Sequence, residues 1–267
     1  MSGSRRYTVV DLMALKGQRQ ITMLYVDTLD EAAAAAAAGI DMLSIIQPVW
    51  TAEMRAAAGA CFVQVGLLYG ELCTYEDYLR AAHAAMRVGG DCCYCAAGLD
   101  TIRGLRAEGI PVIGHVGLIP SQCTWTGGFT AVGKTAESAM MVYRQVKDLE
   151  AAGAIGAELE VVPDRVAAEI SRRTPLLMLS MGSGGGCDGQ YLFAEDVLGY
   201  TRGHRPRHAK VYRNFAAEYR RLQQERIAAF KEFAADVASG AFPARGNLVG
   251  IEDRELDAFL GALEEGR

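Results

Sequence analysis

A histidine and two glutamates stand where an α/β protein carries its chemistry, at the ends of apolar runs. Glu160 closes one such run just before Pro163, so its carboxylate should face a partly desolvated site and suit general acid/base catalysis. Glu158 lies two residues earlier on the same strand face and deeper, which leaves the choice between the two glutamates open. His115 follows Gly114 at the end of another run and is expected to face a substrate. The alternatives are a structural ion pair for Glu160 and a satisfied core histidine for His115.

A glycine-rich string, GSGGGCDG from Gly182 to Gly189, contains the pattern G-x-G-x-x-G. It comes late in the chain, without a second βαβ half or a ribose-binding acid, so a dinucleotide site is not favoured. We expect a loop at the mouth of a strand, where the backbone amides of Gly182, Ser183 and Gly184 approach an anionic substrate. A tight turn that binds nothing is the alternative.

A second phosphate-like motif is GFTAVGKT, from Gly128 to Thr135, which matches G-x-x-x-x-G-K-[ST] letter by letter. A phosphate-binding P-loop follows directly on a buried strand, because the strand holds the loop's backbone amides in place. The residues before Gly128 are SQCTWTG, which are polar and aromatic. ATP or GTP binding is therefore not favoured.

Cysteines and histidines, the usual zinc ligands, do not form a cluster in the sequence. Strand alternation sends Cys93 and Cys95 to one face and Cys92 to the other. No second Cys or His pair stands at zinc-finger spacing, so we expect buried small hydrophobes here. Three histidines fall in polar settings and are expected to be solvated, namely His83, His204 and His208.

The elements that must position these residues are strands and helices in alternation. The runs predicted as strands are Ile21–Val26, Met42–Ile46, Cys61–Leu67, Asp91–Ala96, Pro111–Ile113, Ile155–Glu160 and Leu176–Ser180, with an eighth near Ala209–Tyr212. A helical pattern follows each of the first seven. Eight such units in 267 residues favour a closed (β/α)8 TIM barrel, an α/β fold with a parallel sheet. A doubly wound open sheet is the runner-up.

After Tyr212 the pattern changes to a helical extension. A long helix is predicted from Asn214 to Ala238 and an amphipathic one from Glu252 to Leu263. Neither can enclose a core alone, so residues 1–267 are predicted to form a single barrel domain. Residues 213–267 should then serve as C-terminal helices for capping or oligomer contacts.

Composition restricts the partners. With 51% hydrophobic residues and a formal charge of −5, the chain can bury a large core and presents no basic face for nucleic acid. The N-terminus has no signal-peptide pattern, and no apolar run of about eighteen residues occurs, so a cytoplasmic protein without membrane contact is expected. Seven cysteines, an odd number scattered through the chain, are expected to stay reduced. Small molecules are the expected partners.

Four segments taken together resemble one family. GIPVIGHVGLIPSQ, GGFTAVGKT, LEAAGAIGAELEVVP and MGSGGGCDGQYL are similar to ketopantoate hydroxymethyltransferase, within the phosphoenolpyruvate mutase/isocitrate lyase superfamily. The likeness runs from about Gly109 to Tyr212, and more loosely over Ile21 to Gly39 and Ser239 to Pro243. It also accounts for the P-loop-like string as the family's own loop G-G-[FY]-x-V-Q-G-[KR].

The resemblance implies a fold, a reaction and two site residues. Members of this family are barrels, usually decamers, that use Mg²⁺ and methylenetetrahydrofolate to add a hydroxymethyl group to an α-keto acid. The family's acid/base glutamate falls on Glu160, and the histidine of its GH[LIV]G motif falls on His115. A homo-oligomer and a small-molecule substrate follow from the same likeness.

This chain departs from the family where the metal is held. The aspartates of V-G-D-S and A-D-L-P fall on Gln47 and Gly66, and the lysine and glutamate of K-[IL]-E-G-G fall on Tyr94 and Ala96. A hard cation prefers several oxygen ligands, so we expect no Mg²⁺ at these positions, and no cofactor finds firm support. Tyr25, Gln47 and Tyr94 are then expected to supply polar groups to the substrate in place of the metal.

Three functions remain open on these grounds. The leading hypothesis is a divergent, metal-independent hydroxymethyltransferase-like enzyme that forms or cleaves a C–C bond in a small α-keto acid or related carbonyl compound. The second is a catalytically degenerate homologue that binds a ligand or stabilises a partner. The third is ordinary 3-methyl-2-oxobutanoate hydroxymethyltransferase activity. The substrate, the direction of reaction and the use of folate are not determined by the sequence.

Overall fold

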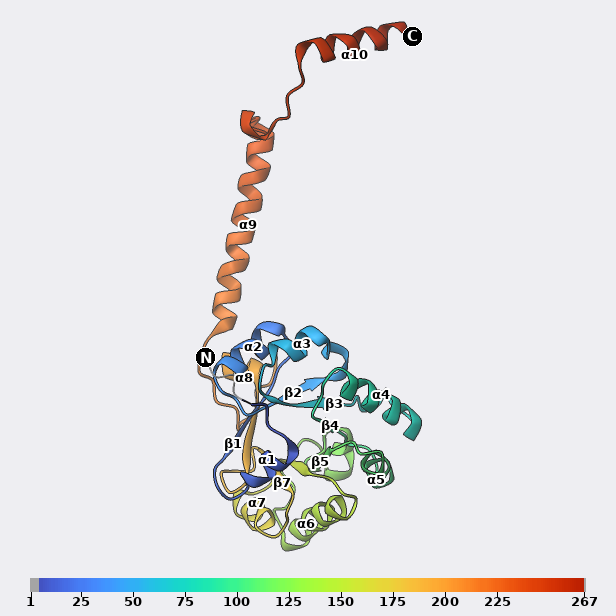
Figure 1. Cartoon of the computed structure of the whole chain (residues 1–267). Helices are drawn as coiled ribbons and strands as arrows, with labels where there is room; N and C mark the ends of the chain where they lie inside the picture. The colour runs from blue at the N-terminus through green and yellow to red at the C-terminus, as the bar shows by residue number, and fades with distance from the viewer. Residues whose placement is uncertain (1–4, 267) are drawn as a thin grey trace. The chain divides into compact units, whose positions relative to one another are not determined.

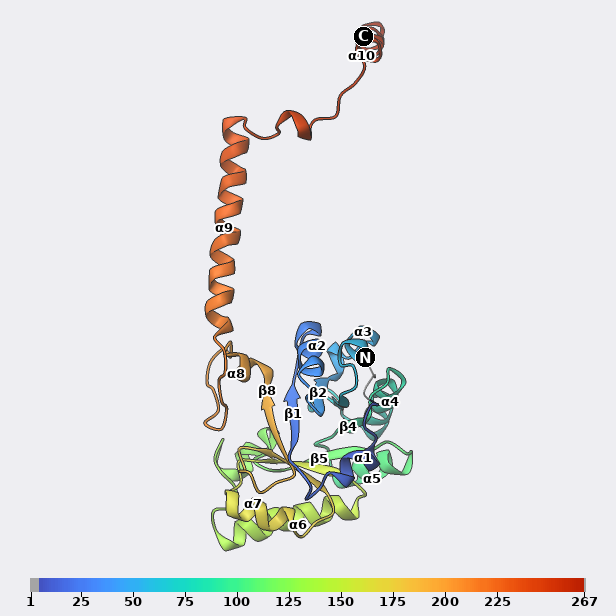
Figure 2. The same cartoon turned by 60° about the vertical axis from the view of Figure 1, so that its left-hand side comes forward.

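A closed barrel of eight parallel strands in sequential order forms the centre of the computed structural model, which describes residues 5–266 (Figure 1). The strands are β1 Ile21–Tyr25, β2 Met42–Ile46, β3 Phe62–Gly66, β4 Cys92–Tyr94, β5 Val112–Gly117, β6 Gly156–Glu160, β7 Leu177–Met181 and β8 Gly189–Phe193. Strand β8 pairs with β1 from Ile21 to Tyr25 and so closes the barrel (Figure 2). The predicted TIM barrel is confirmed, and the open sheet is excluded.

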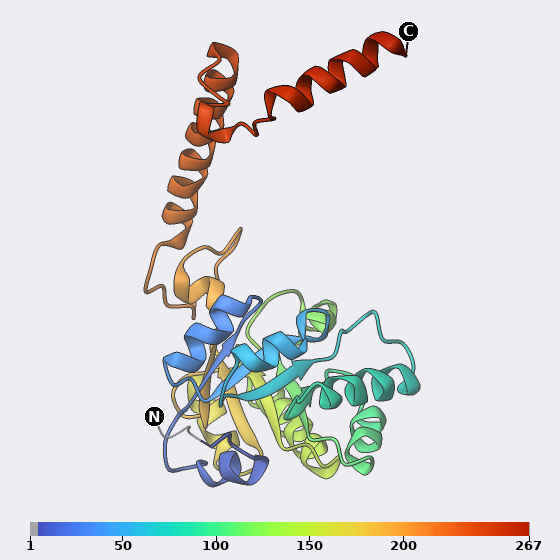
Figure 3. The ribbon, with the colours of Figure 1, turned by 45° about the horizontal axis from the view of Figure 1, so that its top comes forward.

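Helices surround the strands on the outside of the barrel. They are α2 Leu29–Ala37, α3 Ala52–Ala57, α4 Tyr75–Arg87, α5 Leu99–Ala107, α6 Ala136–Ala151, α7 Asp164–Ser171 and α8 Ala194–Leu198, with α1 Val9–Ala14 before β1 and the 3₁₀ turns η1 Gln47–Val49 and η2 Pro120–Thr126. Threonine side chains accept hydrogen bonds from the first turns of α2, α3, α4 and α6, which fixes where these helices begin. Neighbouring helices pack in pairs, as α4 and α5 do (Figure 3). No helix within residues 5–266 combines the length and apolarity needed to cross a membrane.

The eighth strand was predicted at the wrong place. It is formed by Gly189–Phe193, directly after the glycine-rich loop, and Ala209–Tyr212 is not a strand. The loop from Gly182 to Asp188 returns the chain to the N-terminal end of the barrel without a crossover helix. The prediction expected a helix between each strand and the next. The fifth strand also runs further than predicted, to Gly117. His115 therefore lies inside β5 and not after it.

Two apolar layers hold the barrel together. Met23, Met42 and Phe62 belong to the layer inside the barrel, whereas the other layer lies between the strands and the helices. Cys92 belongs to the inner layer, and Cys93 and Cys95 belong to the outer layer, as strand alternation predicted. Burial raises the pKa of the Cys93 thiol to about 12, which suits a buried small hydrophobe.

Residues 214–267 form a second compact unit of their own. It consists of α9 Phe215–Ser239, the 3₁₀ turn η3 Arg245–Asn247 and α10 Asp253–Glu265. No described residue of α9 or α10 is buried, and Phe230, Phe233 and Val237 of α9 are each more than half exposed. Capping or oligomer contact by this unit stays a prediction.

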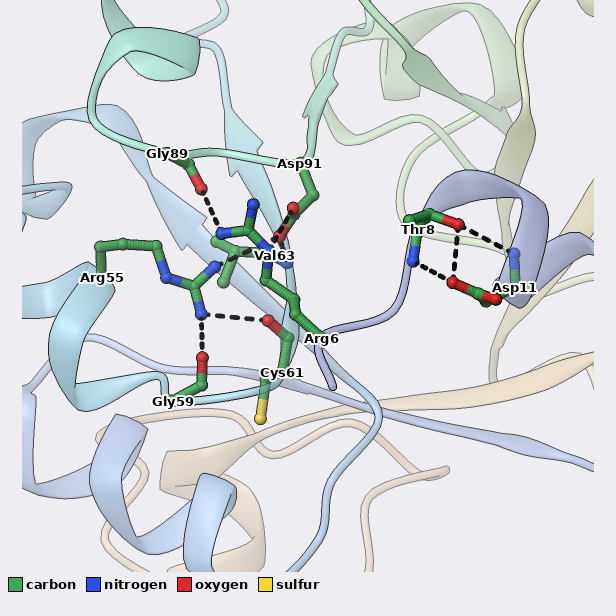
Figure 4. Close-up of polar contacts among 9 residues, drawn as sticks. All are labelled: Arg6, Thr8, Asp11, Arg55, Gly59, Cys61, Val63, Gly89 and Asp91. Carbon is green, nitrogen blue, oxygen red and sulfur yellow. Dashed lines mark hydrogen bonds and ion pairs between the residues drawn. The ribbon is translucent and has the colours of Figure 1, made fainter. Parts of the chain in front are cut away.

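The N-terminal end of the barrel carries a partly buried aspartate held by two arginines. Asp91 directly precedes β4, and Arg6 and Arg55 each lie 3.2 Å from its carboxylate (Figure 4). Arg55, on α3, also donates to the carbonyl oxygens of Gly59 and Cys61 at 2.7 and 3.1 Å. One side chain thus ties α3, β3 and β4 together at this end.

Two further aspartates at the same end are held in a similar way. Asp41 directly precedes β2 and lies 2.6 Å from the guanidinium of Arg19. Asp188 directly precedes β8 and lies 2.5 Å from the ammonium of Lys16. Each of these three aspartates, of which Asp41 and Asp188 are buried and Asp91 is partly buried, therefore has a cation as its partner.

Candidate active site

A cavity of about 410 Å³ lies at the carboxyl ends of the strands, where (β/α)8 enzymes place their chemistry. We call it the mouth cavity. Its lining comprises Tyr25, Ser44, Ile46, Gly66, Tyr94, His115, Pro120, Phe129, Glu158, Glu160, Met181, Tyr191, Leu192, Phe193, Asp196, Pro206 and His208. A larger groove of about 860 Å³ lies between α6 and α7 on the outside of the barrel, away from His115 and Glu160.

His115 forms the centre of a buried polar group in this cavity. Its Nε2 lies 3.1 Å from Glu160 and 2.9 Å from the carbonyl oxygen of Leu118, and its Nδ1 lies 2.9 Å from the hydroxyl of Tyr94 and 3.4 Å from Glu158. Burial lowers the pKa of His115, but the two glutamates outweigh it and raise the value to about 9. At neutral pH the imidazole is protonated, so both ring nitrogens donate.

The two glutamates differ in depth. Glu158 accepts a hydrogen bond of 2.7 Å from the fully buried amide of Gln64, which also donates to Ser44 at 3.2 Å. The side chain of Glu158 is 6% exposed, and that of Glu160 is 14% exposed. Glu160 is therefore the more accessible carboxylate, while Glu158 is bound on both sides by Gln64 and His115.

The backbone just after Glu160 is held in an unusual conformation. Val161 has φ of 48°, in the left-handed region that β-branched residues rarely adopt. Its N–H donates to Met181 and its carbonyl accepts from Val132, so the neighbouring loops keep it there. A Cβ at Gly117 would lie 2.4 Å from the carbonyl oxygen of Glu160, so only glycine allows β5 to approach so closely. Such strain is typical of functional sites.

Of the polar groups predicted to face the substrate, two tyrosines line the mouth cavity. The hydroxyl of Tyr25 donates to Asp27 at 2.6 Å, and its ring lies 4.8 Å from that of Phe193. Burial, followed by the carboxylates of Glu158 and Glu160, raises the pKa of Tyr94, so its phenol is neutral.

Gln47 is not among the described residues that line the mouth cavity. It lies in η1, one residue beyond β2, so the alternation of β2 brings Ser44 and Ile46 to the cavity instead. A role for Gln47 in substrate binding stays a prediction.

The glycine-rich loop packs closely against its neighbours. A Cβ at Gly182 would lie 2.5 Å from His208, and one at Gly184 would lie 2.6 Å from Asp164. Ser183 is fully buried, and its hydroxyl donates to the carbonyl oxygen of Leu159 at 2.7 Å. These contacts give a packing reason for the glycines, and an anion cradle formed by their amides stays a prediction.

His208 was expected to be solvated, and this prediction was wrong. It is half-buried against Gly182 and lines the mouth cavity, together with the buried Asp196. Burial lowers the pKa of His208. No local pattern signals this placement, because the polar segment around His208 reads as a surface loop and reaches the cavity only by folding back over the end of β7.

The sequence and the fold both match known proteins. The family model for ketopantoate hydroxymethyltransferase matches residues 49–245. The chain belongs to the ketopantoate hydroxymethyltransferase family. It is 34% identical over 192 residues to the 3-methyl-2-oxobutanoate hydroxymethyltransferase of Cenarchaeum symbiosum, covering 71% of this chain and 70% of that protein. It is 33% identical over 262 residues to an enzyme of the same name from Thermus thermophilus, covering 89% and 97%.

A solved structure supports the same fold. 2,3-Dimethylmalate lyase, a member of the phosphoenolpyruvate mutase/isocitrate lyase superfamily, matches with a TM-score of 0.52 and 13% identity over 98% of this chain and 100% of that one. At this identity the likeness concerns the fold alone.

The side chains at the metal-binding positions of the ketopantoate hydroxymethyltransferase family do not fit a hard cation. Gly66 lines the mouth cavity but has no side chain, and Gln47 is not among the lining residues. Ala96 lines a separate cavity of about 190 Å³. Between residues 5 and 266, no cluster of three or more His, Cys, Asp or Glu side chains is arranged to hold a metal ion. Mg²⁺ needs near-octahedral oxygen ligands, and these positions supply too few.

The P-loop-like string is also explained by the fold. Gly128–Thr135 is separated from the end of β5 by η2 and leads into α6, whose N-cap is Thr135. Phe129 reaches the mouth cavity, whereas Lys134 lines the outer groove. This loop does not follow directly on a strand, which agrees with the expectation that it is not a P-loop.

Proposed function

We propose that this chain is a divergent ketopantoate hydroxymethyltransferase-like enzyme that forms or cleaves a C–C bond beside the carbonyl of a small α-keto acid or related compound, without the family's Mg²⁺ site. The observation that carries the proposal is Glu160, the more accessible of two glutamates, held 3.1 Å from a buried, protonated His115 at the barrel mouth. A carboxylate fixed beside a cavity in this way is suited to move a proton.

The proposed reaction begins with proton transfer to Glu160. The carboxylate takes a proton from the carbon next to the substrate carbonyl, and the negative charge passes to the carbonyl oxygen. Because Nδ1 of His115 donates to Tyr94, the hydroxyl hydrogen of Tyr94 is free to donate to that oxygen. The enolate carbon then attacks the carbonyl carbon of an aldehyde, whose C=O π bond breaks, and the resulting alkoxide takes the proton from Glu160. Cleavage follows the same steps in reverse.

This assignment gives Tyr94 part of the work that a metal does elsewhere in the family. One well-placed donor contributes roughly 10²–10³ in rate, and a general base contributes about 10²–10⁴. Gln64 donates to Glu158, and Glu158, 3.4 Å from Nδ1 of His115, favours the protonated imidazole.

The first test is exchange of the proton next to the carbonyl. In D₂O, the intact chain should exchange the α-proton of a bound carbonyl compound, and Glu160→Gln should slow this exchange by about 10²–10⁴. Glu137→Gln, at an exposed site in the first turn of α6, is the matched control. Proton NMR measures both rates. Exchange that is equally fast in Glu160→Gln would remove Glu160 from the mechanism.

A second candidate function is ligand binding without catalysis. The observation that favours it is the loss of side chains at the metal-binding positions. A plugged cavity would strengthen it, but Trp50 is buried elsewhere, with its Nε1 donating to Ala85 at 3.0 Å, and Tyr94 lines the mouth cavity without filling it. Ordinary hydroxymethyltransferase activity is the third candidate, and an assay with methylenetetrahydrofolate and added Mg²⁺ tests it.

We also infer that the chain works as a cytoplasmic homo-oligomer with a small-molecule substrate. The exposed apolar residues of α9, including Phe230 and Phe233, support an oligomer because a helix with such a face is stabilised by covering it. The composition supports the cytoplasmic location, since its charge and reduced cysteines suit that compartment.

A further inference from the structure

We propose that the mouth cavity selects a substrate whose reacting part is uncharged or positively charged, and that it disfavours the free carboxylate of an α-keto acid. The inference rests on the proposed function and narrows its substrate class, from small α-keto acids and related carbonyl compounds to those related compounds that carry no free carboxylate at the reacting part. It follows from the charges that the described residues bring to the cavity lining, in which carboxylates outnumber cations.

Three carboxylates line the mouth cavity, those of Glu158, Glu160 and Asp196. Among the described residues, no lysine or arginine lines it. The protonated His115 balances one carboxylate, and burial lowers the pKa of His208, which favours its neutral form. Two negative charges are therefore left at the cavity before any substrate enters.

The surroundings of Asp196 make this side of the cavity more negative. Asp196 is 4% exposed, and its carboxylate accepts a hydrogen bond of 2.5 Å from Thr201, a neutral group. The neighbouring Glu195 has its pKa raised, first by burial and then by Asp196, Asp27 and Glu31. The part of this rise that comes from the three neighbouring carboxylates indicates a negative potential on this side of the cavity.

The nearest arginines do not enter the cavity. Arg205 and Arg207 flank Pro206, which is in the lining, but both are exposed and neither is a lining residue. Arg207 acts on His208 by lowering its pKa further. Cations in this exposed position are screened by water and salt, whereas the buried carboxylates are screened much less.

The remaining lining favours an apolar body on the substrate. Ile46, Met181, Leu192 and Phe193 form apolar walls, and the neutral hydroxyl of Tyr94 is the donor placed to meet a carbonyl oxygen. In this partly open cavity each unbalanced unit charge about 6 Å away changes binding by roughly tenfold, at an effective dielectric constant of about 40, so two such charges change it by about a hundredfold. A ketone, an amide or an aminoketone fits these groups, and a carboxylate meets repulsion.

The test uses three ligands of one carbon skeleton that differ in charge: 3-methyl-2-oxobutanoate, 3-methyl-2-oxobutanamide and 1-amino-3-methylbutan-2-one in its ammonium form. Calorimetric titration of the intact chain at pH 7, in the presence of a chelator, should give a dissociation constant for the amide about a hundredfold below that of the carboxylate, and a dissociation constant for the ammonium that is lower still. Equal or tighter binding of the carboxylate overturns the inference. Carboxylate binding that appears only with added Mg²⁺ overturns it as well.

Two variants examine the cause of the preference. Asp196→Asn should narrow the gap between carboxylate and amide by about tenfold, because one of the two unbalanced charges is removed. Asp100→Asn, at a fully exposed site on α5, should leave the gap unchanged. A gap that is the same in Asp196→Asn and in the intact chain contradicts the charge explanation.

The failure of this inference is distinguishable from the failure of the proposed function. If the keto acid binds as tightly as the amide, and its α-proton exchanges in the intact chain but not in Glu160→Gln, the proposed function stands and the charge preference fails. If the amide binds preferentially but no ligand exchanges its α-proton, the charge preference stands and the proposed function fails.

Discussion

The two ends of the barrel differ in whether their carboxylates are paired with lysine or arginine. At the N-terminal end, Asp41, Asp91 and Asp188 are each paired with lysine or arginine. At the C-terminal end, the carboxylates of Glu158, Glu160 and Asp196 line one cavity together with two histidines. His115 is protonated, whereas burial lowers the pKa of His208. The first arrangement joins strands to the segments around them, whereas the second leaves negative charge beside an open cavity. This contrast agrees with the general division of the fold, in which the C-terminal end carries the active site and the N-terminal end contributes to stability.

The pairing at the N-terminal end is not uniform in strength. Burial raises the pKa of Asp41, but Arg19 and Thr22 outweigh it, and the net pKa lies below the ordinary value. Burial raises the pKa of Asp91 as well, and there it outweighs the hydrogen bond from Val63 and the charges of Arg6 and Arg55. Asp91 therefore depends most on keeping both of its arginines.

The largest effect is expected from breaking the Asp91 cluster. Arg55→Met keeps an apolar stem but leaves Asp91 with Arg6 alone, which is half exposed, so the free energy of unfolding should fall by about 3–5 kcal/mol. Urea denaturation measures it. Arg103→Met, which removes an exposed pair with Asp100, should cost less than about 1 kcal/mol. A loss in Arg55→Met as small as in this control would show that the two ends do not differ.

A smaller effect is expected from the pH dependence of His115. Its pKa is about 9 in the folded chain and 6.5 ordinarily, so its contribution is fully present below pH 6.5 and is lost as the pH rises to 9. The expected loss in the free energy of unfolding is about 3 kcal/mol, from ~1.4 kcal/mol for each pH unit. Chemical denaturation at several pH values measures it.

The control for this pH dependence is a chain with Glu158→Gln and Glu160→Gln together. Without the two carboxylates, burial alone acts on His115, and the fall in stability above pH 6.5 should disappear. The same fall in this double variant would mean that another group titrates.

The smallest effect is expected from Asp196→Asn, for which Asp91→Asn at the other end is the comparison. Asparagine keeps a partner for Thr201 and removes an unbalanced charge, so the unfolding free energy should change by less than about 1 kcal/mol or rise. Asp91→Asn should lower it by about 2 kcal/mol or more, because two arginines lose their partner. Equal losses at both positions, measured by urea denaturation, would contradict the contrast between the ends.

Much of the fold was predictable from local patterns. Apolar runs and the helical periods between them indicated seven of the eight strands and the barrel, and alternation within β4 placed Cys92 apart from Cys93 and Cys95. The eighth strand was predicted at the wrong place because Gly189–Phe193 follows a loop, whereas the prediction expected a helix between each strand and the next.

The sequence by itself determined the family, the barrel and the candidacy of Glu160 and His115, because motifs and periodicity are properties of neighbouring residues. Only the tertiary structure decided that Gln64 binds Glu158 and that His208 and Asp196 reach the same cavity as Glu160. The balance of charge at each end was decided there too. It depends on side chains far apart in the chain, which the closure of the barrel brings together and which no local pattern records.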